Sequence, residues 1–131
     1  MPTSGFTISS RFGEAGSYWA SGYHTGIDFA TDHGTPAAAV SNATVVQAGW
    51  DGAYGNHVRL RLENGDEVSY SHLSSIAVVD GERVSTGQRV GRVGETGNAY
   101  GAHLHFEYRL AGNLDEAVNP RPRLAEHGVA P

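Results

Sequence analysis

Two histidines separated by one residue are the strongest chemical signal in this sequence. His103 and His105 lie in Gly101–Glu107, a run that reads as a β-strand. Side chains two residues apart on a strand point to the same face, so both imidazoles can serve one reacting centre. Taken alone the pair is a weak signal, because paired histidines also occur on ordinary solvated strands.

Three further residues strengthen this signal. His24 and Asp28 are spaced as H-x-x-x-D, and His72 lies between Ser71 and Leu73. Three histidines and a carboxylate, with another histidine close by, suit a catalytic zinc site, in which three protein ligands leave the fourth position to water. The metal lowers the pKa of that water from ~15.7 to about 7 and polarises a carbonyl brought against it.

The spacing of His24 and Asp28 requires a bend between them. On a straight strand the two residues would lie about 13 Å apart. Helix is also disfavoured, since Gly26 and the run 27–29 are poor helix formers. We therefore expect Gly26 to turn both side chains toward one point. Asp32 is an alternative ligand to Asp28, although its spacing of eight from His24 matches no familiar pattern.

The remaining imidazoles have different expected roles. His105 is the best third ligand, and His103 beside it stays unbound. An unbound imidazole next to the activated water can take its proton or donate to the developing oxyanion, and His72 could do the same from a neighbouring strand. His57 lies on the polar side of its strand, and it would pair with His72 if Asn64-Gly65 formed a two-residue hairpin turn. His33 is expected to be solvated or bonded within its loop, and His127, near the end of the chain, is expected to have no function.

Composition excludes several classes of function. The chain has 131 residues and a net charge of −5, which argues against binding nucleic acid. It has no cysteine, which excludes thiolate zinc sites and thiol nucleophiles, and every basic residue is arginine, which excludes Schiff-base and lipoyl lysines. No apolar run approaches the ~20 residues of a membrane span, and we expect no secretion signal within this chain.

The elements that must position these residues are strands. Eighteen glycines divide the chain into short segments that alternate apolar and polar residues, and no window has a convincing helical stripe. We expect an all-β fold of mostly antiparallel sheets, a sandwich or barrel-like hybrid, in one domain over residues 1–131 with an irregular tail at 121–131. The expected strands lie at 43–48, 58–62, 67–72, 83–84, 89–93 and 104–110.

Several further motifs occur in a fixed order along about residues 12–120. They are His24-x-x-x-Asp28, Gly26-Ile27-Asp28-Phe29-Ala30, Tyr54-Gly55-Asn56-x-Val58, Tyr70-x-His72-Leu73, Gly87-Gln88-x-Val90-Gly91 and Thr96-Gly97-x-x-x-Gly101-x-His103-Leu104-His105-Phe106. Together they resemble the motifs of the lysostaphin-type, LytM-like zinc metallopeptidases, which are peptidoglycan endopeptidases.

The resemblance implies a role for each of the chemical residues. It implies one zinc ion per chain, held by His24, Asp28 and His105, with His72 and His103 acting in catalysis. It also implies long loops that form a narrow groove over the metal on a β-sheet.

A tyrosine shortly before the first histidine often stabilises the tetrahedral intermediate in this family. Tyr18 is the candidate here and Tyr23 is its rival. We assign Tyr23, Tyr54, His57 and Asn98 to substrate contacts along the groove.

The resulting hypothesis is a zinc-dependent endopeptidase that hydrolyses peptide bonds of bacterial peptidoglycan, either in the cross-bridge or in the stem peptide. The expected partner is the peptidoglycan peptide, and the expected location is extracellular or at the cell wall. We expect a monomer. The alternative is a non-catalytic relative that binds peptidoglycan or activates another hydrolase, which the presence of all five metal and catalytic positions disfavours.

Overall fold

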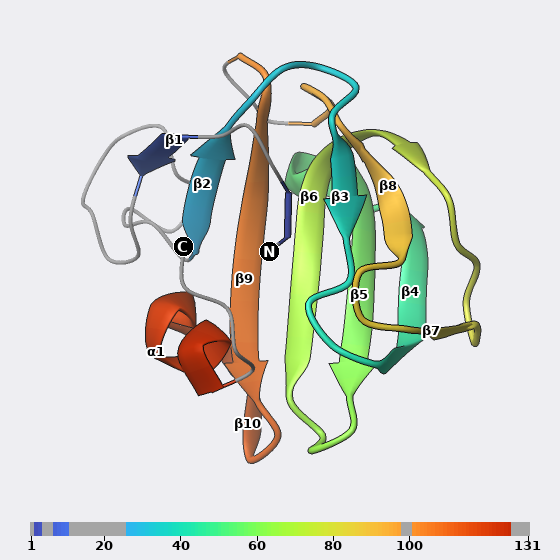
Figure 1. The fold of residues 1–131 in the computed structure, drawn as a ribbon, viewed down its shortest axis with the longest axis vertical. Helices are drawn as coiled ribbons and strands as arrows, with labels where there is room; N and C mark the ends of the chain where they lie inside the picture. Colours follow the sequence, from blue (N-terminus) through green and yellow to red (C-terminus); the bar gives the residue numbers. More distant parts are fainter. Residues whose placement is uncertain (1, 4–6, 11–25, 98–100, 127–131) are drawn as a thin grey trace.

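The computed structural model of the chain describes residues 2–3, 7–10, 26–97 and 101–126, and strands dominate that part (Figure 1). In chain order the elements are β1 (Thr7–Ser10), β2 (Ile27–Ala30), β3 (Pro36–Ala38), β4 (Ala43–Trp50), the 3-10 turn η1 (Gly52–Tyr54), β5 (Asn56–Leu62), β6 (Glu67–Ile76), β7 (Arg83–Val84), β8 (Arg89–Val93), β9 (His103–Leu110), β10 (Asn113–Val118) and α1 (Pro120–Glu126).

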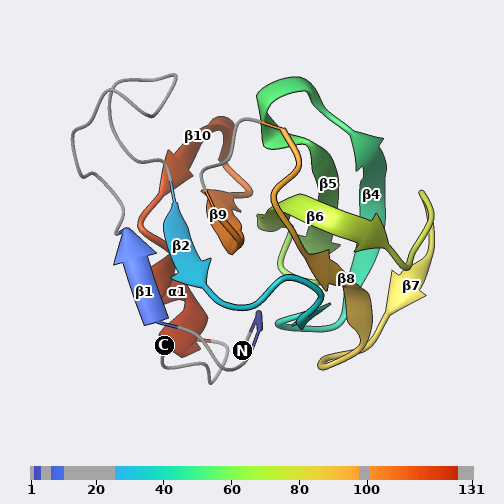
Figure 2. The same cartoon turned by 90° about the horizontal axis from the view of Figure 1, so that it is seen from above.

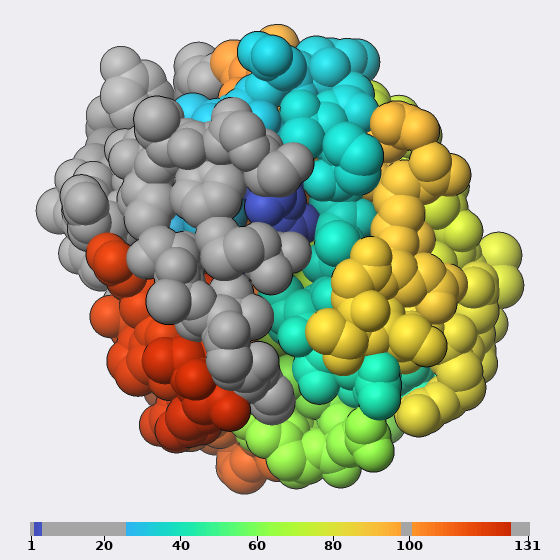
Figure 3. Space-filling view, in the orientation of Figure 1, coloured from blue at the N-terminus to red at the C-terminus, as the bar shows by residue number. Residues whose placement is uncertain are grey.

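The strands form one antiparallel sheet whose main order is β1-β2-β9-β6-β5-β4-β7. Strand β10 pairs antiparallel with β9, and β8 pairs with both β6 and β3. Because of these extra pairings, β3 and β8 lie over one side of β4, β5 and β6, as the two ribbon views show (Figure 2). The space-filling view shows side chains of β3 and β8 covering this side of the molecule (Figure 3). The expected all-β, mostly antiparallel fold is confirmed.

The three central strands divide their side chains between a core and a polar face. Apolar residues alternate with polar ones along β5 and β9, and successive side chains of a strand point to opposite faces. The apolar set, which includes Leu60, Leu104 and Phe106, is fully buried. The other set forms what we call the polar face: His57, Arg59 and Arg61 from β5, Glu67, Ser69 and Ser71 from β6, and His103, His105, Glu107 and Arg109 from β9.

The connection between β5 and β6 differs from the two-residue turn considered for Asn64-Gly65. The strands end at Leu62 and resume at Glu67, so residues 63–66 form a longer loop. Asp66 holds this loop in place, since its carboxylate accepts hydrogen bonds from the Tyr108 hydroxyl at 2.6 Å and from the Ala111 amide at 2.8 Å. The register near the loop is therefore one residue away from the one that would pair His57 with His72.

A β-bulge in β6 brings His72 onto the polar face. Val58 pairs with Tyr70 and Asn56 pairs with Leu73, so β6 uses one residue more than β5 over this stretch. The backbone of His72 has a φ of 63°, in the left-handed region. Such an extra residue re-aims a side chain. Tyr70 and Leu73 are therefore both buried in the core, while Ser71 and His72 lie between them in sequence.

The tail contains a helix where an irregular segment was expected. Helix α1 runs from Pro120 to Glu126, and Leu124 is fully buried against the core. The side chain of Asn119 accepts a hydrogen bond from the Arg121 amide at 3.2 Å, and proline suits the first helical position. Residues 127–131 lie outside the described part. No helix in the described ranges is long and apolar enough to cross a membrane.

Candidate active site

Asp28 and His105 form the centre of the site. They lie directly opposite each other on β2 and β9, and His105 Nδ1 is 2.7 Å from Asp28 Oδ1. Both residues are buried. Gly26 lets β2 come this close to β9, because a Cβ at position 26 would overlap the carbonyl oxygen of Phe106. The glycine expected to bend the chain is thus required for a close approach between strands.

Glu107 holds the other nitrogen of His105. Its Oε2 lies 2.7 Å from His105 Nε2, and its Oε1 accepts a hydrogen bond from Arg109 Nη2 at 2.8 Å. Glu107 is 1% exposed. Burial alone would lower the pKa of His105, but the hydrogen bonds to Asp28 and Glu107 outweigh it and raise this pKa to about 9. The carboxylates of Asp28 and Glu107 therefore favour a positive charge at His105, which lies between them.

This donor set fits a zinc ion. An imidazole nitrogen and a carboxylate oxygen are typical zinc ligands, and a zinc-binding histidine usually has its second nitrogen held by a carboxylate or a carbonyl. Asp28 and His105 supply two donors. No group of three or more metal-binding side chains occurs within residues 26–97 and 101–126 or the two shorter described segments. The expected third ligand, His24, lies outside the described residues, as do Tyr18, Tyr23 and Asn98.

His72 and His103 lie beside this pair. Their ring centroids are 4.9 Å apart, and the ring of His72 is 6.1 Å from that of His105. His103 Nε2 is 3.8 Å from Asp28 Oδ1. The structure thus brings together four of the five residues expected to bind metal or catalyse, from strands β2, β6 and β9.

Backbone carbonyls set the tautomer of both outer histidines. His72 Nδ1 is 2.7 Å from the Thr96 carbonyl oxygen, and His103 Nδ1 is 3.0 Å from that of Gly101. A carbonyl only accepts, so the proton of each neutral ring resides on Nδ1 and Nε2 keeps its lone pair. Burial, together with His103 and His105, lowers the pKa of His72 to about 4, against a smaller opposing effect of Thr96. His72 is therefore an unprotonated base at neutral pH.

Thr96 is a positioning residue to which sequence reasoning gave no role. Besides holding His72, its hydroxyl donates to the Leu73 carbonyl at 2.6 Å and accepts from the Asn56 amide at 3.0 Å. These bonds fix the loop after β8 against the bulge in β6. Thr96-Gly97 was part of a recognisable motif, but nothing in its composition indicated this contact.

Tyr54 and His57 form one wall next to the site. Their rings stack with centroids 5.0 Å apart, and Tyr54 is 6.3 Å from the ring of His105. Burial lowers the pKa of His57 to about 4, and Gln47 Oε1 lies 2.8 Å from its Nδ1. Burial and the nearby Glu107 carboxylate raise the pKa of Tyr54 to about 12. Both residues were assigned to substrate contacts, and the structure places the ring of Tyr54 beside those of His57 and His105.

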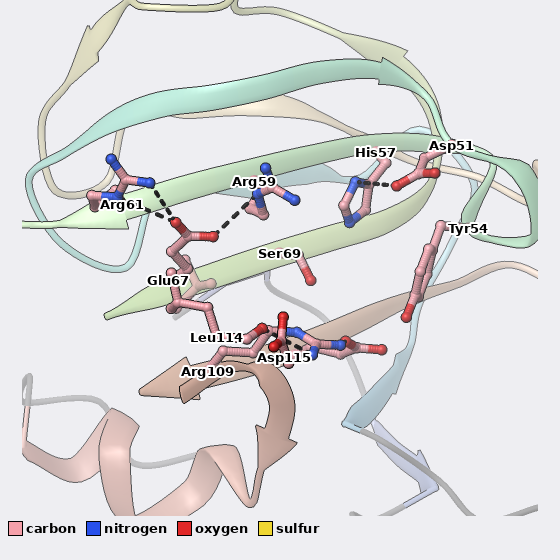
Figure 4. Close-up of a pocket in the computed structure, with 12 residues that line it drawn as sticks. Asp51, Tyr54, His57, Arg59, Arg61, Glu67, Ser69, Arg109, Leu114 and Asp115 are labelled. Atoms are coloured by element: carbon pink, nitrogen blue, oxygen red, sulfur yellow. Dashed lines mark hydrogen bonds and ion pairs between the residues drawn. The ribbon is translucent and has the colours of Figure 1, made fainter. Parts of the chain in front are cut away.

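A pocket of ≈ 410 Å³ continues from this wall along the polar face (Figure 4). Tyr54 and His57 stand at one end, and Arg61 and Glu67 at the other. Sequence reasoning gave none of the pocket's charged residues a function.

Comparisons with known proteins find a matching family and similar sequences. The model of peptidase family M23 matches residues 22–120. The chain is 43% identical over 97 residues to the DD-carboxypeptidase/endopeptidase Mpg of Neisseria meningitidis, covering 74% of this chain and 22% of that protein. It is 38% identical over 112 residues to lysostaphin of Staphylococcus simulans, covering 82% of this chain and 22% of lysostaphin. The chain thus spans about a fifth of the length of these relatives.

Solved structures show the same fold. The catalytic domain of lysostaphin from Staphylococcus simulans superposes with a TM-score of 0.86 at 32% identity, covering 92% of each chain. A zinc-containing peptidase from Vibrio cholerae superposes with a TM-score of 0.78 at 28% identity, covering 90% of this chain and 37% of that one. The matched residues 22–120 include every candidate metal and catalytic residue except Tyr18. The chain belongs to peptidase family M23, the metallopeptidase class that its motifs indicated.

Proposed function

We propose that this chain is the catalytic domain of a zinc-dependent endopeptidase that cleaves peptide bonds in bacterial peptidoglycan. The observation that carries the proposal is the Asp28–His105 pair with His72 and His103 next to it. The names of the relatives, which include a DD-endopeptidase and a glycyl-glycine endopeptidase, support the substrate class. Because the substrate is cell-wall peptide, we place the site of action outside the cell or at the wall.

His24, Asp28 and His105 would hold one zinc ion. When bound, zinc supplies a Lewis acid that polarises the scissile carbonyl and makes a water molecule acidic near neutral pH. Glu107 orients His105 for this task, and Arg109 neutralises the second oxygen of Glu107.

The two outer histidines would move protons during hydrolysis. The Nε2 lone pairs of His72 and His103 can accept a proton from the attacking water, and either ring, once protonated, can donate to the leaving amine or the oxyanion. Tyr18, or alternatively Tyr23, is proposed as a further hydrogen-bond donor to that oxyanion. Tyr54, His57, Tyr23 and Asn98 would contact the substrate.

Incubation with defined cross-linked muropeptides, followed by mass spectrometry of the products, tests the proposal. We expect a single type of peptide bond to be cleaved, with activity abolished by a chelator and restored by added zinc. A protein that binds these muropeptides but cleaves none of them, with zinc present, would instead be the non-catalytic relative.

Zinc affinity should depend on Glu107. The Glu107→Gln variant keeps the size of the side chain but removes the negative charge that orients His105, and loss of such a partner typically weakens metal binding about 10–100-fold. Competition with a chromogenic chelator measures the change. Glu63→Gln, at an exposed position in the β5–β6 loop, is the matched control. Equal zinc affinity in the two variants would refute the role of Glu107.

A further inference from the structure

We propose that the arginine-lined end of the pocket is a subsite for a free carboxylate of the substrate peptide. The inference rests on the proposed function, because it extends that substrate from the cleaved bond to a second recognised group. The residues that form the subsite are Arg59 and Arg61 of β5, with Glu67 beneath them (Figure 4).

Strand register sets the distance of the subsite from the catalytic residues. Ser71 pairs with His105 in the catalytic row, and the next rows on the same face pair Ser69 with Arg59 and Glu67 with Arg61. Each row is two residues further along the strands, or about 7 Å. The rows of Arg59 and Arg61 therefore lie about 7 and 14 Å along the strands from the row of His105, and β5 lies two strands across from β9, about 10 Å away. The resulting separations of about 12 and 17 Å are within reach of a group three to five residues from the cleaved bond.

Burial separates the two signs of charge in the pocket. The carboxylates of Glu67 and Glu107 belong to side chains only 5% and 2% exposed, whereas the side chains of Arg59 and Arg61 are 43% and 53% exposed. Glu67 and Glu107 therefore form the floor, and the guanidinium groups of Arg59 and Arg61 stand above Glu67. At this end of the pocket a ligand meets N–H donors before it meets the Glu67 carboxylate.

Arg59 and Arg61 keep hydrogen-bond donors that a ligand could use. Glu67 is a single carboxylate shared by two guanidinium groups, with ion-pair distances of 3.1 Å to Arg59 Nε and 2.9 Å to Arg61 Nη2. Among the described residues, Arg59 Nε is buried without a partner in hydrogen-bond geometry. Within this group of three side chains one positive charge is left over. A planar guanidinium binds a carboxylate through two parallel hydrogen bonds.

The rim limits what can bind. Asp51 and Asp115 line the pocket and are exposed. Two nearby negative charges oppose a dianion more strongly than a single carboxylate. The pocket therefore suits one carboxylate carried on a neutral or amine-bearing peptide, such as a stem peptide with a free carboxyl group.

Two muropeptides that differ in one group test the subsite. In one, a carboxylate three to five residues from the cleaved bond is free, and in the other the same carboxylate is amidated. Each such position is compared in turn. At one position we expect the native protein to favour the free acid in kcat/KM by about tenfold or more, as for charge-assisted hydrogen bonds. Arg59→Gln should bring that ratio close to one, and Arg59→Lys should give an intermediate ratio.

The controls distinguish failure of the subsite from failure of the proposed function. Arg61 still pairs with Glu67 in Arg59→Gln, so the floor carboxylate keeps a partner. Arg89→Gln, exposed on β8 and outside the pocket lining, should keep the native ratio. Cleavage of acid and amide at equal rates, at every position, would overturn the subsite and leave the endopeptidase intact.

A binding measurement decides the case in which nothing is cleaved. The same acid and amide peptides are titrated into the native protein, and the arginine Nε–H resonances are followed by NMR. We expect the acid alone to shift the resonances of Arg59 and Arg61, whether or not hydrolysis occurs. No shift with either peptide at millimolar concentration would overturn the subsite.

Discussion

His105→Ala should lose its zinc and with it all measurable peptidoglycan hydrolysis. His105 is the residue on which the contacts of the site converge, with Asp28 on one nitrogen and Glu107 on the other. Its removal deletes a metal ligand and leaves two buried carboxylates facing an empty space. Since hydrolysis needs the acidity that zinc gives to water, a shift in pKa of about eight to nine units, the rate should fall to background.

Metal analysis and turnover on the same samples measure this effect. His33→Ala is the matched control, because His33 is exposed and was expected to be solvated. Asp28→Asn should behave like His105→Ala. Asp32→Asn should keep full zinc occupancy, because the structure places Asp28, and not the exposed Asp32, against His105. Full zinc content in His105→Ala would remove the basis of the proposed metal site.

Much of the polar face could be predicted from alternation alone. Once β5 and β9 are recognised as strands, His57, Arg59 and Arg61 must share one face, and so must His103, His105 and Glu107. The pairing of Asp28 with His105 could not be derived in this way. It depends on β2 joining the sheet beside β9, a contact between residues 77 apart in sequence that Gly26 makes possible.

Neither helix α1 nor the role of Glu107 was predicted from the sequence, and the reasons differ. Asn119-Pro120 is a reasonable helix start, but the prolines of this tail suggested an irregular segment. Burial of Leu124 against the core favours the helix, and the sequence alone did not reveal that burial. Glu107 was visible as the last residue of the H-x-H run. Its role is evident only from the structure, in which the Glu107 carboxylate contacts His105 through one oxygen and Arg109 through the other.

The position of His72 shows where simple alternation fails. Counting by twos from Val68 and Tyr70 would bury His72 in the core, yet Leu73 is also fully buried. Tyr70 and Leu73 are two apolar positions three residues apart in a strand that otherwise alternates by two, and this spacing is the sequence sign of the bulge in β6. The left-handed backbone of His72 is the structural result.

The second large effect is expected when either outer histidine, His72 or His103, is replaced. Each substitution should lower turnover without releasing zinc. Neither ring is in the proposed ligand set, and each keeps an Nε2 lone pair next to the metal-binding pair. Loss of a proton-transfer or oxyanion partner typically costs ~10²–10⁴-fold in rate. We expect His103→Ala and a suitable His72 variant to fall in this range of kcat.

The choice of substitution at position 72 follows from its backbone. Alanine is strained at a φ of 63°, so His72→Ala would mix a catalytic effect with a local change in the bulge. Asparagine tolerates this conformation, and its amide can still donate to the Thr96 carbonyl, but it has no basic nitrogen. His72→Asn therefore isolates the imidazole. Zinc content and thermal stability should stay close to native while kcat falls; a near-native kcat in His72→Asn would show that this histidine only supports the bulge.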